Sequence, residues 1–210
     1  MAQTIPTIQH YYEVMDDRAR MISELREVFA EVGSNHVLIG GLAAGHHGRP
    51  RATIDVDFLV PGTKLRGLVR ALEGRGYPVK QFLPDMIRVF ARGADPATTE
   101  AIADLVSKDA NPVLRAAFDA AEPAKVLGFQ LNVVKRGAFV ALKFHSAVSP
   151  KRRIEDRYVD IADIGRVIAK HFDADDLELA RSIAKKMYPG AVEELEKMIE
   201  DLRAGRPVSM

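Results

Sequence analysis

The chain has 210 residues, of which 47% are hydrophobic and 28% charged, and its formal net charge is +1 at pH 7. This composition suits a globular protein that can bury its own core, and it excludes a strongly basic nucleic-acid coat. Cysteine is absent, which excludes disulfides and thiolate chemistry and favours a cytoplasmic protein. Residues 1–10 lack the basic start and apolar core of a signal peptide, and no apolar run reaches the roughly 18 residues that a membrane-spanning helix needs, so we expect no membrane association.

The first part of the chain alternates between helical and extended patterns. Ile22, Leu25 and Phe29 fall at helical spacing before Gly33, which predicts a helix that ends there. Short apolar runs bounded by glycine or proline predict buried strands. The predicted elements are, in chain order, helix 12–32, strand 36–39, helix 42–47, strand 54–60, helix 63–74, one or two strands within 82–92, strand 101–107, helix 113–121 and an extended segment at 129–134.

From Gly137 onward the pattern is helical, with a loop at 149–153. The predicted helices are 138–147, 156–171, 174–187 and 191–203. We therefore expect an α+β fold in which a mixed sheet flanked by helices is followed by a helical C-terminal region. The expected domains are 1–134, an α/β core with an N-terminal helix, and 135–210, a helical region that packs over a shared cleft.

An acidic strand is the most informative segment. Within Ile54–Val60, Asp55 and Asp57 are two residues apart and should share one face of the strand, roughly 6–7 Å apart. Like charges this close disfavour mutual ionisation unless a cation lies between them, and carboxylate oxygens are hard ligands that suit magnesium. A half-exposed strand with a polar face is the alternative.

Two neighbouring patterns support a site. Gly40-Gly41 stands between a predicted strand and a predicted helix, where glycine lets the backbone approach a ligand closely, although such a pair is also typical of an ordinary turn. Asp104 lies inside an apolar strand, where an unpaired carboxylate is costly, so it either faces Asp55 and Asp57 as a third ligand or lies on an exposed edge.

Taken together, these residues resemble the signature of the DNA polymerase beta-like nucleotidyltransferase superfamily: Gly40-Gly41, thirteen further residues, then Asp55-Val56-Asp57-Phe58. The string Arg51-x-Thr53-x-Asp55-x-Asp57 looks like a bacterial and archaeal branch that includes the AbiEii-type toxins and uncharacterised relatives. The resemblance covers about residues 36–170.

The resemblance implies transfer of a nucleoside monophosphate from a nucleoside triphosphate (NTP) to a hydroxyl acceptor, with release of pyrophosphate. It implies that Asp55, Asp57 and Asp104 are catalytic and bind magnesium, with two ions expected, and that Asp104 is the best candidate to deprotonate the hydroxyl. The expected nucleotide-binding residues are Gly40, Gly41, Arg51, Thr53, Lys143 and Asp160.

In the helical region, the resemblance places Lys143 facing the triphosphate, and a snorkelling surface lysine is the alternative. Arg157, Asp160 and Asp163 recur every third residue and should share a helix face, as in a similar family segment; of the two acids Asp160 is preferred for the site. The basic stretch Lys151-Arg152-Arg153 can steer a polyanion such as RNA, or it is a flexible charged loop.

An AbiEii-like role implies a toxin-type enzyme that modifies tRNA, with a cognate antitoxin or other partner protein. Two alternatives remain open: a non-catalytic nucleotide- or partner-binding module of a toxin–antitoxin pair, and a small-molecule nucleotidyltransferase of the antibiotic-modifying type. The three acids disfavour the non-catalytic module.

Overall fold

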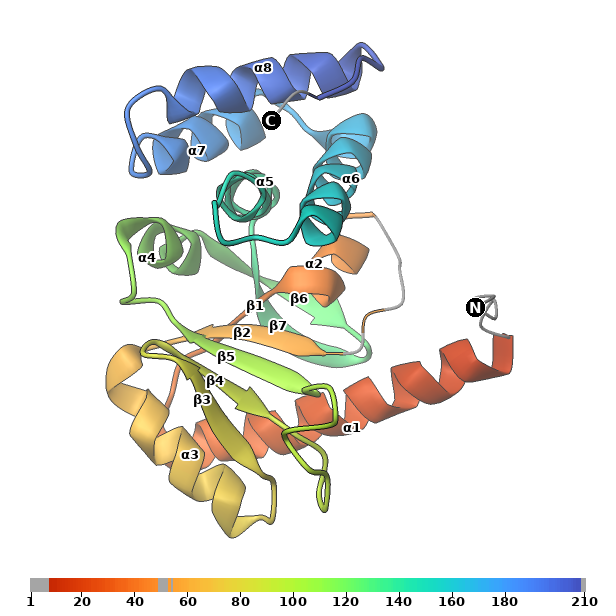
Figure 1. Ribbon diagram of the computed structural model, residues 1–210, viewed down its shortest axis with the longest axis vertical. Coiled ribbons are helices and arrows are strands. Elements are labelled where there is room, and N and C mark those ends of the chain that lie inside the picture. The colour runs from red at the N-terminus through yellow and green to blue at the C-terminus, as the bar shows by residue number, and fades with distance from the viewer. Residues whose placement is uncertain (1–7, 49–52, 54, 209–210) are drawn as a thin grey trace.

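A seven-stranded mixed sheet organises the computed structural model, which describes residues 8–48, 53 and 55–208 (Figure 1). The strand order is β3-β4-β5-β2-β1-β7-β6. The pairs β1–β7 and β2–β5 are parallel and the other four pairs are antiparallel, which confirms the predicted α+β class with a mixed sheet. The strands are β1 (Val37–Ile39), β2 (Val56–Val60), β3 (Val79–Leu83), β4 (Met86–Val89), β5 (Ala103–Ser107), β6 (Ala121–Val126) and β7 (Phe129–Val134).

Helices cover both faces of this sheet (Figure 1). The long α1 and α3 pack against each other on one face, whereas α2, α4 and α5 lie on the other. Beyond α5, the helices α6, α7 and α8 form an outer layer, and α5 contacts both α6 and α7. The helices are α1 (Ile8–Val32), α2 (Gly40–His46), α3 (Leu65–Gly74) after a 3₁₀ turn at Gly62–Lys64, α4 (Pro112–Asp119), α5 (Arg136–Ala147), α6 (Ile154–His171), α7 (Ala174–Ala184) and α8 (Ala191–Arg203).

Local sequence signals explain several element ends. In α1, Ile22, Leu25 and Phe29 form a fully buried stripe, as their helical spacing predicts. Asn111 caps α4 by accepting a hydrogen bond from the Leu114 backbone N–H, and Pro112 occupies the first turn, where no N–H partner is needed.

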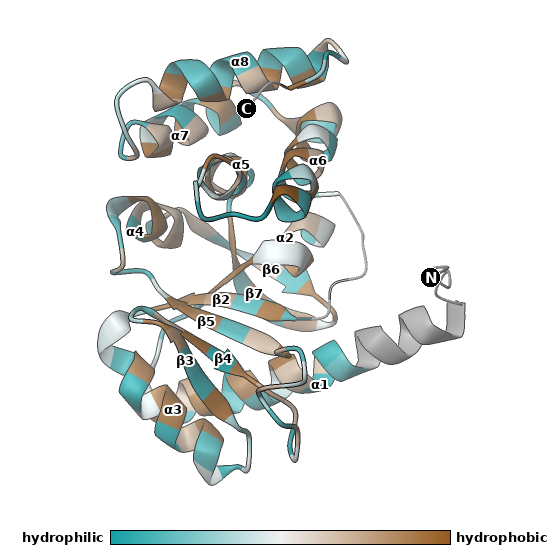
Figure 2. Cartoon of the chain, in the orientation of Figure 1, coloured by the Kyte–Doolittle hydropathy of each residue, from teal (hydrophilic) through white to brown (hydrophobic). Residues whose placement is uncertain are grey.

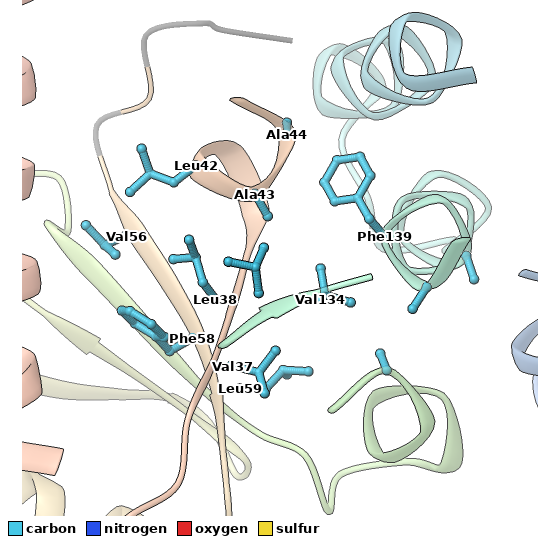
Figure 3. Packing of buried hydrophobic residues seen from close by; sticks show 14 of the residues in the cluster. Val37, Leu38, Leu42, Ala43, Ala44, Val56, Phe58, Leu59, Val134 and Phe139 are labelled. Atoms are coloured by element: carbon cyan, nitrogen blue, oxygen red, sulfur yellow. The ribbon is translucent and has the colours of Figure 1, made fainter. Parts of the chain in front are cut away.

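The buried apolar residues form one cluster that extends from α1 to α8. Figure 3 shows part of it, with Leu38 of β1 near Phe58 of β2, and with Phe139 projecting from α5 toward Ala43 and Ala44 of α2. Figure 2 shows hydrophobic residues along the strands and on α5. Because β7 ends at Val134 and α5 begins at Arg136, the predicted boundary falls between the sheet and the helical region, and the division into two domains stays a prediction.

In the part of the chain that the structure describes, no helix combines the length and the apolar character needed to cross a membrane.

Several predicted elements need correction. The strand β6 was missed because Ala121–Val126 lacks a regular apolar alternation and contains Pro123, which an edge strand tolerates. The region 82–92 forms two strands that begin earlier than predicted, at Val79, and turn at residues 84–85. The predicted helix 174–187 ends at Ala184, and the predicted strand 54–60 begins only at Val56.

Candidate active site

Three acidic residues converge at one end of the central strands. Asp57 of β2 and Asp104 of β5 are direct partners in the parallel register, which places their side chains on the same face. The prediction that Asp55 belongs to the strand is wrong, because Asp55 lies in the bend that precedes β2. One carboxylate oxygen from each of Asp55, Asp57 and Asp104 lies within 4.8 Å of the other two. The structure therefore brings the three predicted acids together, and metal binding by them stays a prediction.

The electrostatics of this acidic cluster favour a bound cation. Burial, together with the negative charges of Asp55 and Asp104, raises the pKa of Asp57 to about 8, against the opposing charge of Lys143. Burial also raises the pKa of Asp104 to about 6, although the Arg88 guanidinium opposes this shift. Asp104 Oδ1 is buried and accepts no hydrogen bond of ordinary geometry from the described residues, although Arg88 Nε lies 3.5 Å from it. Three crowded carboxylates match the hard oxygen ligands that magnesium prefers.

Two glycines make room for this arrangement. Gly40 has φ +67°, and a Cβ atom there would lie 1.7 Å from Asp57 Oδ2. A Cβ atom at Gly41 would lie 2.6 Å from the Thr53 hydroxyl oxygen. The Gly41 backbone N–H donates a hydrogen bond to the Asp57 carboxylate, which lowers the pKa of Asp57 against the larger effect of burial. The two glycines thus allow a close backbone approach, but the groups approached are Asp57 and Thr53, and contact with a nucleotide stays a prediction.

Thr53 orients the first acid. Its buried hydroxyl donates a hydrogen bond of 2.9 Å to Asp55 Oδ1, so this residue supports a metal-ligand candidate rather than facing open solvent. Arg51, the other predicted nucleotide-binding residue of the same string, lies outside the described residues.

The predicted residues of the helical region form a buried ionic network. Lys143 of α5 places its Nζ 2.7 Å from Asp160 Oδ1 and 2.9 Å from Asp163 Oδ2, and both carboxylates belong to α6 and are buried. The side chain of Lys143 is only 12% exposed, which excludes a snorkelling surface lysine. Its positive charge also reaches the acidic cluster, because it lowers the pKa of Asp57. The sequence-based preference for Asp160 over Asp163 finds no basis in these contacts, since both hold Lys143.

The basic stretch before α6 is largely paired within the chain. Arg152 Nε lies 3.0 Å from Asp160 Oδ2, and Arg153 Nε lies 3.2 Å from Asp156 Oδ2. Arg157 donates to the backbone carbonyl of Ser149, which ties the loop to α6. These contacts stabilise the loop against α6. Whether the stretch also attracts a polyanion such as RNA stays a prediction.

A cation beside the third acid was not predicted. Arg88 of β4 is the antiparallel partner of Asp104, and its Nε lies 3.5 Å from Asp104 Oδ1. The signal in the sequence was a polar residue between the apolar Ile87 and Val89, but only the strand register shows which residue it faces.

Comparison with known proteins gives a shared fold at low sequence identity. No protein-family model and no curated protein matches the chain. An antigenic nucleotidyltransferase-like protein from Paracoccidioides brasiliensis has a similar structure, with a TM-score of 0.53 and 16% identity over 88% of this chain and 93% of that one.

The antibiotic-resistance factor ANT(2'')-Ia is also similar. Its solution structure gives a TM-score of 0.51 at 16% identity over 90% of this chain and 95% of that one. Its complex with adenylyl-2''-tobramycin gives a TM-score of 0.51 at 18% identity over 90% of this chain and 98% of that one. The chain therefore has a nucleotidyltransferase-type fold.

Proposed function

We propose that this chain is a metal-dependent nucleotidyltransferase that moves a nucleoside monophosphate from an NTP to a hydroxyl acceptor and releases pyrophosphate. The observation that carries the proposal is the convergence of Asp55, Asp57 and Asp104 within 4.8 Å, beside the close backbone of Gly40. The nucleotidyltransferase-type fold supports the same class of reaction.

In this proposal Asp55, Asp57 and Asp104 hold magnesium, with two ions. Bound there, the ions would neutralise charge on the triphosphate and lower the pKa of the acceptor hydroxyl. Gly40 and Gly41 hold the triphosphate. Their backbone lies directly beside the acids, and glycine has no side chain to keep a ligand away from it.

The transfer step forms a bond between the acceptor oxygen and the α-phosphorus and breaks the bond from the α-phosphorus to the oxygen bridging to the β-phosphate. Pyrophosphate leaves with that oxygen. The hydroxyl proton goes to Asp104, the carboxylate that the resemblance makes the best candidate base.

The remaining predicted residues act around this centre. Thr53 orients Asp55 through its 2.9 Å hydrogen bond, and Arg51 completes the nucleotide site. Lys143 contacts the triphosphate, while Asp160 acts as a positioning residue, because its carboxylate lies 2.7 Å from the Lys143 ammonium. The helical region 135–210 is proposed as a second domain that closes over nucleotide and acceptor.

For the acceptor, the resemblance to AbiEii-type toxins makes tRNA the first molecule to test and a cognate antitoxin the partner protein to seek. The same proposal includes a cytoplasmic location, which a sequence without cysteine supports. A small-molecule acceptor is the second candidate, favoured by the fold shared with ANT(2'')-Ia, which has been seen with adenylyl-2''-tobramycin.

A transfer assay tests the proposed function. The protein is incubated with magnesium and each of the four α-labelled NTPs, with total cellular RNA, protein or aminoglycosides as acceptor. We expect label to enter one acceptor class, and we expect EDTA, Asp55→Asn, Asp57→Asn and Asp104→Asn each to abolish it. Removal of a residue that acts only in the transition state lowers kcat by about a hundredfold or more.

Asp175→Asn is the matched control, because Asp175 is an exposed aspartate in the first turn of α7. This variant should transfer label at the wild-type rate. Undiminished transfer by Asp57→Asn, or in EDTA, would contradict the proposal. Magnesium-dependent NTP binding without transfer to any acceptor would instead favour the non-catalytic binding module.

A further inference from the structure

We propose that the exposed face of β3 and β4 beside Asp104, formed by Lys80, Phe82 and Arg88, binds the single-stranded end of an RNA acceptor. This acceptor platform rests on the proposed function and names the substrate class of the same site. Its residues belong to no motif of the sequence and become neighbours only through strand pairing.

The register of four strands places the platform next to the acidic cluster. Asp57 pairs with Asp104, Asp104 pairs with Arg88, and Arg88 pairs with Lys80. Directly paired residues point to the same face of a sheet, so two acids continue into two cations along one row. An acceptor that lies on the cations is therefore adjacent to Asp104, the residue proposed to receive the hydroxyl proton.

An aromatic ring gives this row a flat binding surface. Phe82 is 49% exposed, and the Arg88 guanidinium carbon lies 3.6 Å from the centre of its ring. The adjacent Leu83 is 53% exposed, and both residues belong to β3, which forms one edge of the sheet. Large apolar side chains on an edge strand favour association with other molecules. We therefore interpret the exposure of Phe82 and Leu83 as the mark of a binding surface.

The chemistry of the platform fits a single-stranded polynucleotide. Every nucleobase has a π face that stacks on an aromatic ring or on a guanidinium plane, and lysine and arginine attract the phosphates on either side. Asp85, the acidic residue of the β3–β4 hairpin, is in the turn and outside the two strands. Arg88 is paired with Asp104, and the exposed Lys80 would repel an acceptor rich in ammonium groups and attract a polyanion.

Fluorescence anisotropy with a short labelled single-stranded RNA that has a free 3′ hydroxyl tests the platform on the full chain, with magnesium present. Phe82→Ala should weaken RNA binding about tenfold, as expected for loss of one stacked base, and Phe82→Trp should retain it. Lys80→Ala should weaken binding and lower the slope of log affinity against log salt by about 0.7, the value for one lost phosphate contact on a single strand.

The chain offers matched controls for both changes. Tyr158→Ala removes an aromatic side chain on α6 that is 65% exposed, and Lys125→Ala removes an exposed lysine on β6, the opposite edge of the sheet. Both should bind RNA as the wild type does. Arg88 is left intact, because its loss would also disturb Asp104.

Magnesium-dependent NTP binding, measured by calorimetry on the same variants, separates this inference from the proposed function. We expect it to be unchanged by Phe82→Ala and Lys80→Ala. If NTP binds but RNA does not, or if RNA binding ignores Phe82, the platform is wrong and the proposed function stands. If RNA binding depends on Phe82 but no NTP binds, the platform is supported and the proposed function is wrong.

Sedimentation of the same variants tests the competing occupant of the edge strand, which is a second copy of this chain. A dimer that Phe82→Ala converts into monomers, with RNA binding intact, would overturn the platform.

Discussion

The backbone of Gly40 lies so close to the carboxylate of Asp57 that a Cβ atom at position 40 would stand 1.7 Å from Asp57 Oδ2. The positive φ of Gly40, +67°, is a second reason why only glycine fits, since it disfavours any side chain. Asp57 is therefore held in place by the close backbone of Gly40, the first residue of α2, and the position of each restricts the other.

We predict that Gly40→Ala displaces Asp57 and weakens magnesium binding at least tenfold. The positive φ alone should lower the free energy of unfolding by about 1–2 kcal/mol. Gly45→Ala is the control within the same helix, because a Cβ atom there meets nothing within 4 Å, and it should raise the free energy of unfolding by about 0.5–1 kcal/mol. Calorimetric magnesium titration and urea unfolding check both values; wild-type magnesium affinity in Gly40→Ala would contradict the close-approach argument.

The acidic cluster predicts metal binding that tightens as the pH rises. Asp57, with a pKa of about 8, is protonated at pH 7 in the metal-free protein and must release its proton to bind a cation. Affinity should therefore rise by up to about tenfold per pH unit until pH 8 and then level off, with a second proton released below pH 6, where Asp104 titrates. Titration with Mn²⁺ followed by electron paramagnetic resonance measures this; an affinity independent of pH between 6 and 8 would speak against binding at Asp57.

The buried His47 should make the protein less stable in mild acid. Its Nε2 lies 2.7 Å from the Val134 carbonyl oxygen, and burial lowers its pKa to about 4 from the usual 6.5. Between these values the unfolded chain binds more protons than the folded one, so the free energy of unfolding falls as the pH drops from 6.5 to about 4. The full loss is about 3 kcal/mol at 1.36 kcal/mol per pKa unit.

The His47→Gln variant isolates this contribution, because glutamine does not titrate. The difference in the free energy of unfolding between wild type and variant should change by that amount across the interval in urea unfolding. A difference that stays constant with pH would show that folding does not lower the pKa of His47.

Replacing Lys143 should change both the free energy of unfolding and the pH dependence of metal binding by the acidic cluster. Lys143→Met leaves the buried carboxylates of Asp160 and Asp163 without this cation, which should lower the free energy of unfolding by about 3–5 kcal/mol. It should also move the pH midpoint of metal binding upward, since Lys143 lowers the pKa of Asp57. A merely structural lysine would change the first quantity and not the second.

Lys197→Met provides the comparison, because Lys197 lies 2.8 Å from Asp201 while its own side chain is 66% exposed. It should lower the free energy of unfolding less than Lys143→Met does, because Arg206 Nε still lies 2.8 Å from Asp201 Oδ1, and it should leave metal binding unchanged. Both variants are measured below their unfolding temperatures, so that any change in metal binding belongs to the folded protein.

Elements whose signals are local were predicted well. The bounds of α8 agree with the predicted helix 191–203, and α6 differs from its prediction only in an earlier start at Ile154, because apolar spacing reports a helix directly. The strand β6 was missed, since its pairing with β7 comes from a distant segment and leaves no alternation in its own residues.

The sequence by itself determined the class of the fold, the acidic pair Asp55 and Asp57 and the glycine pair where β1 passes into α2, because these depend on neighbouring residues along the chain. Only the tertiary structure decided that Asp104 pairs with Asp57 and with Arg88, and that Lys143 lies between Asp160 and Asp163. Strand order, register and helix packing arise from contacts between segments far apart in the chain, and no local pattern encodes which partner a buried charge will meet.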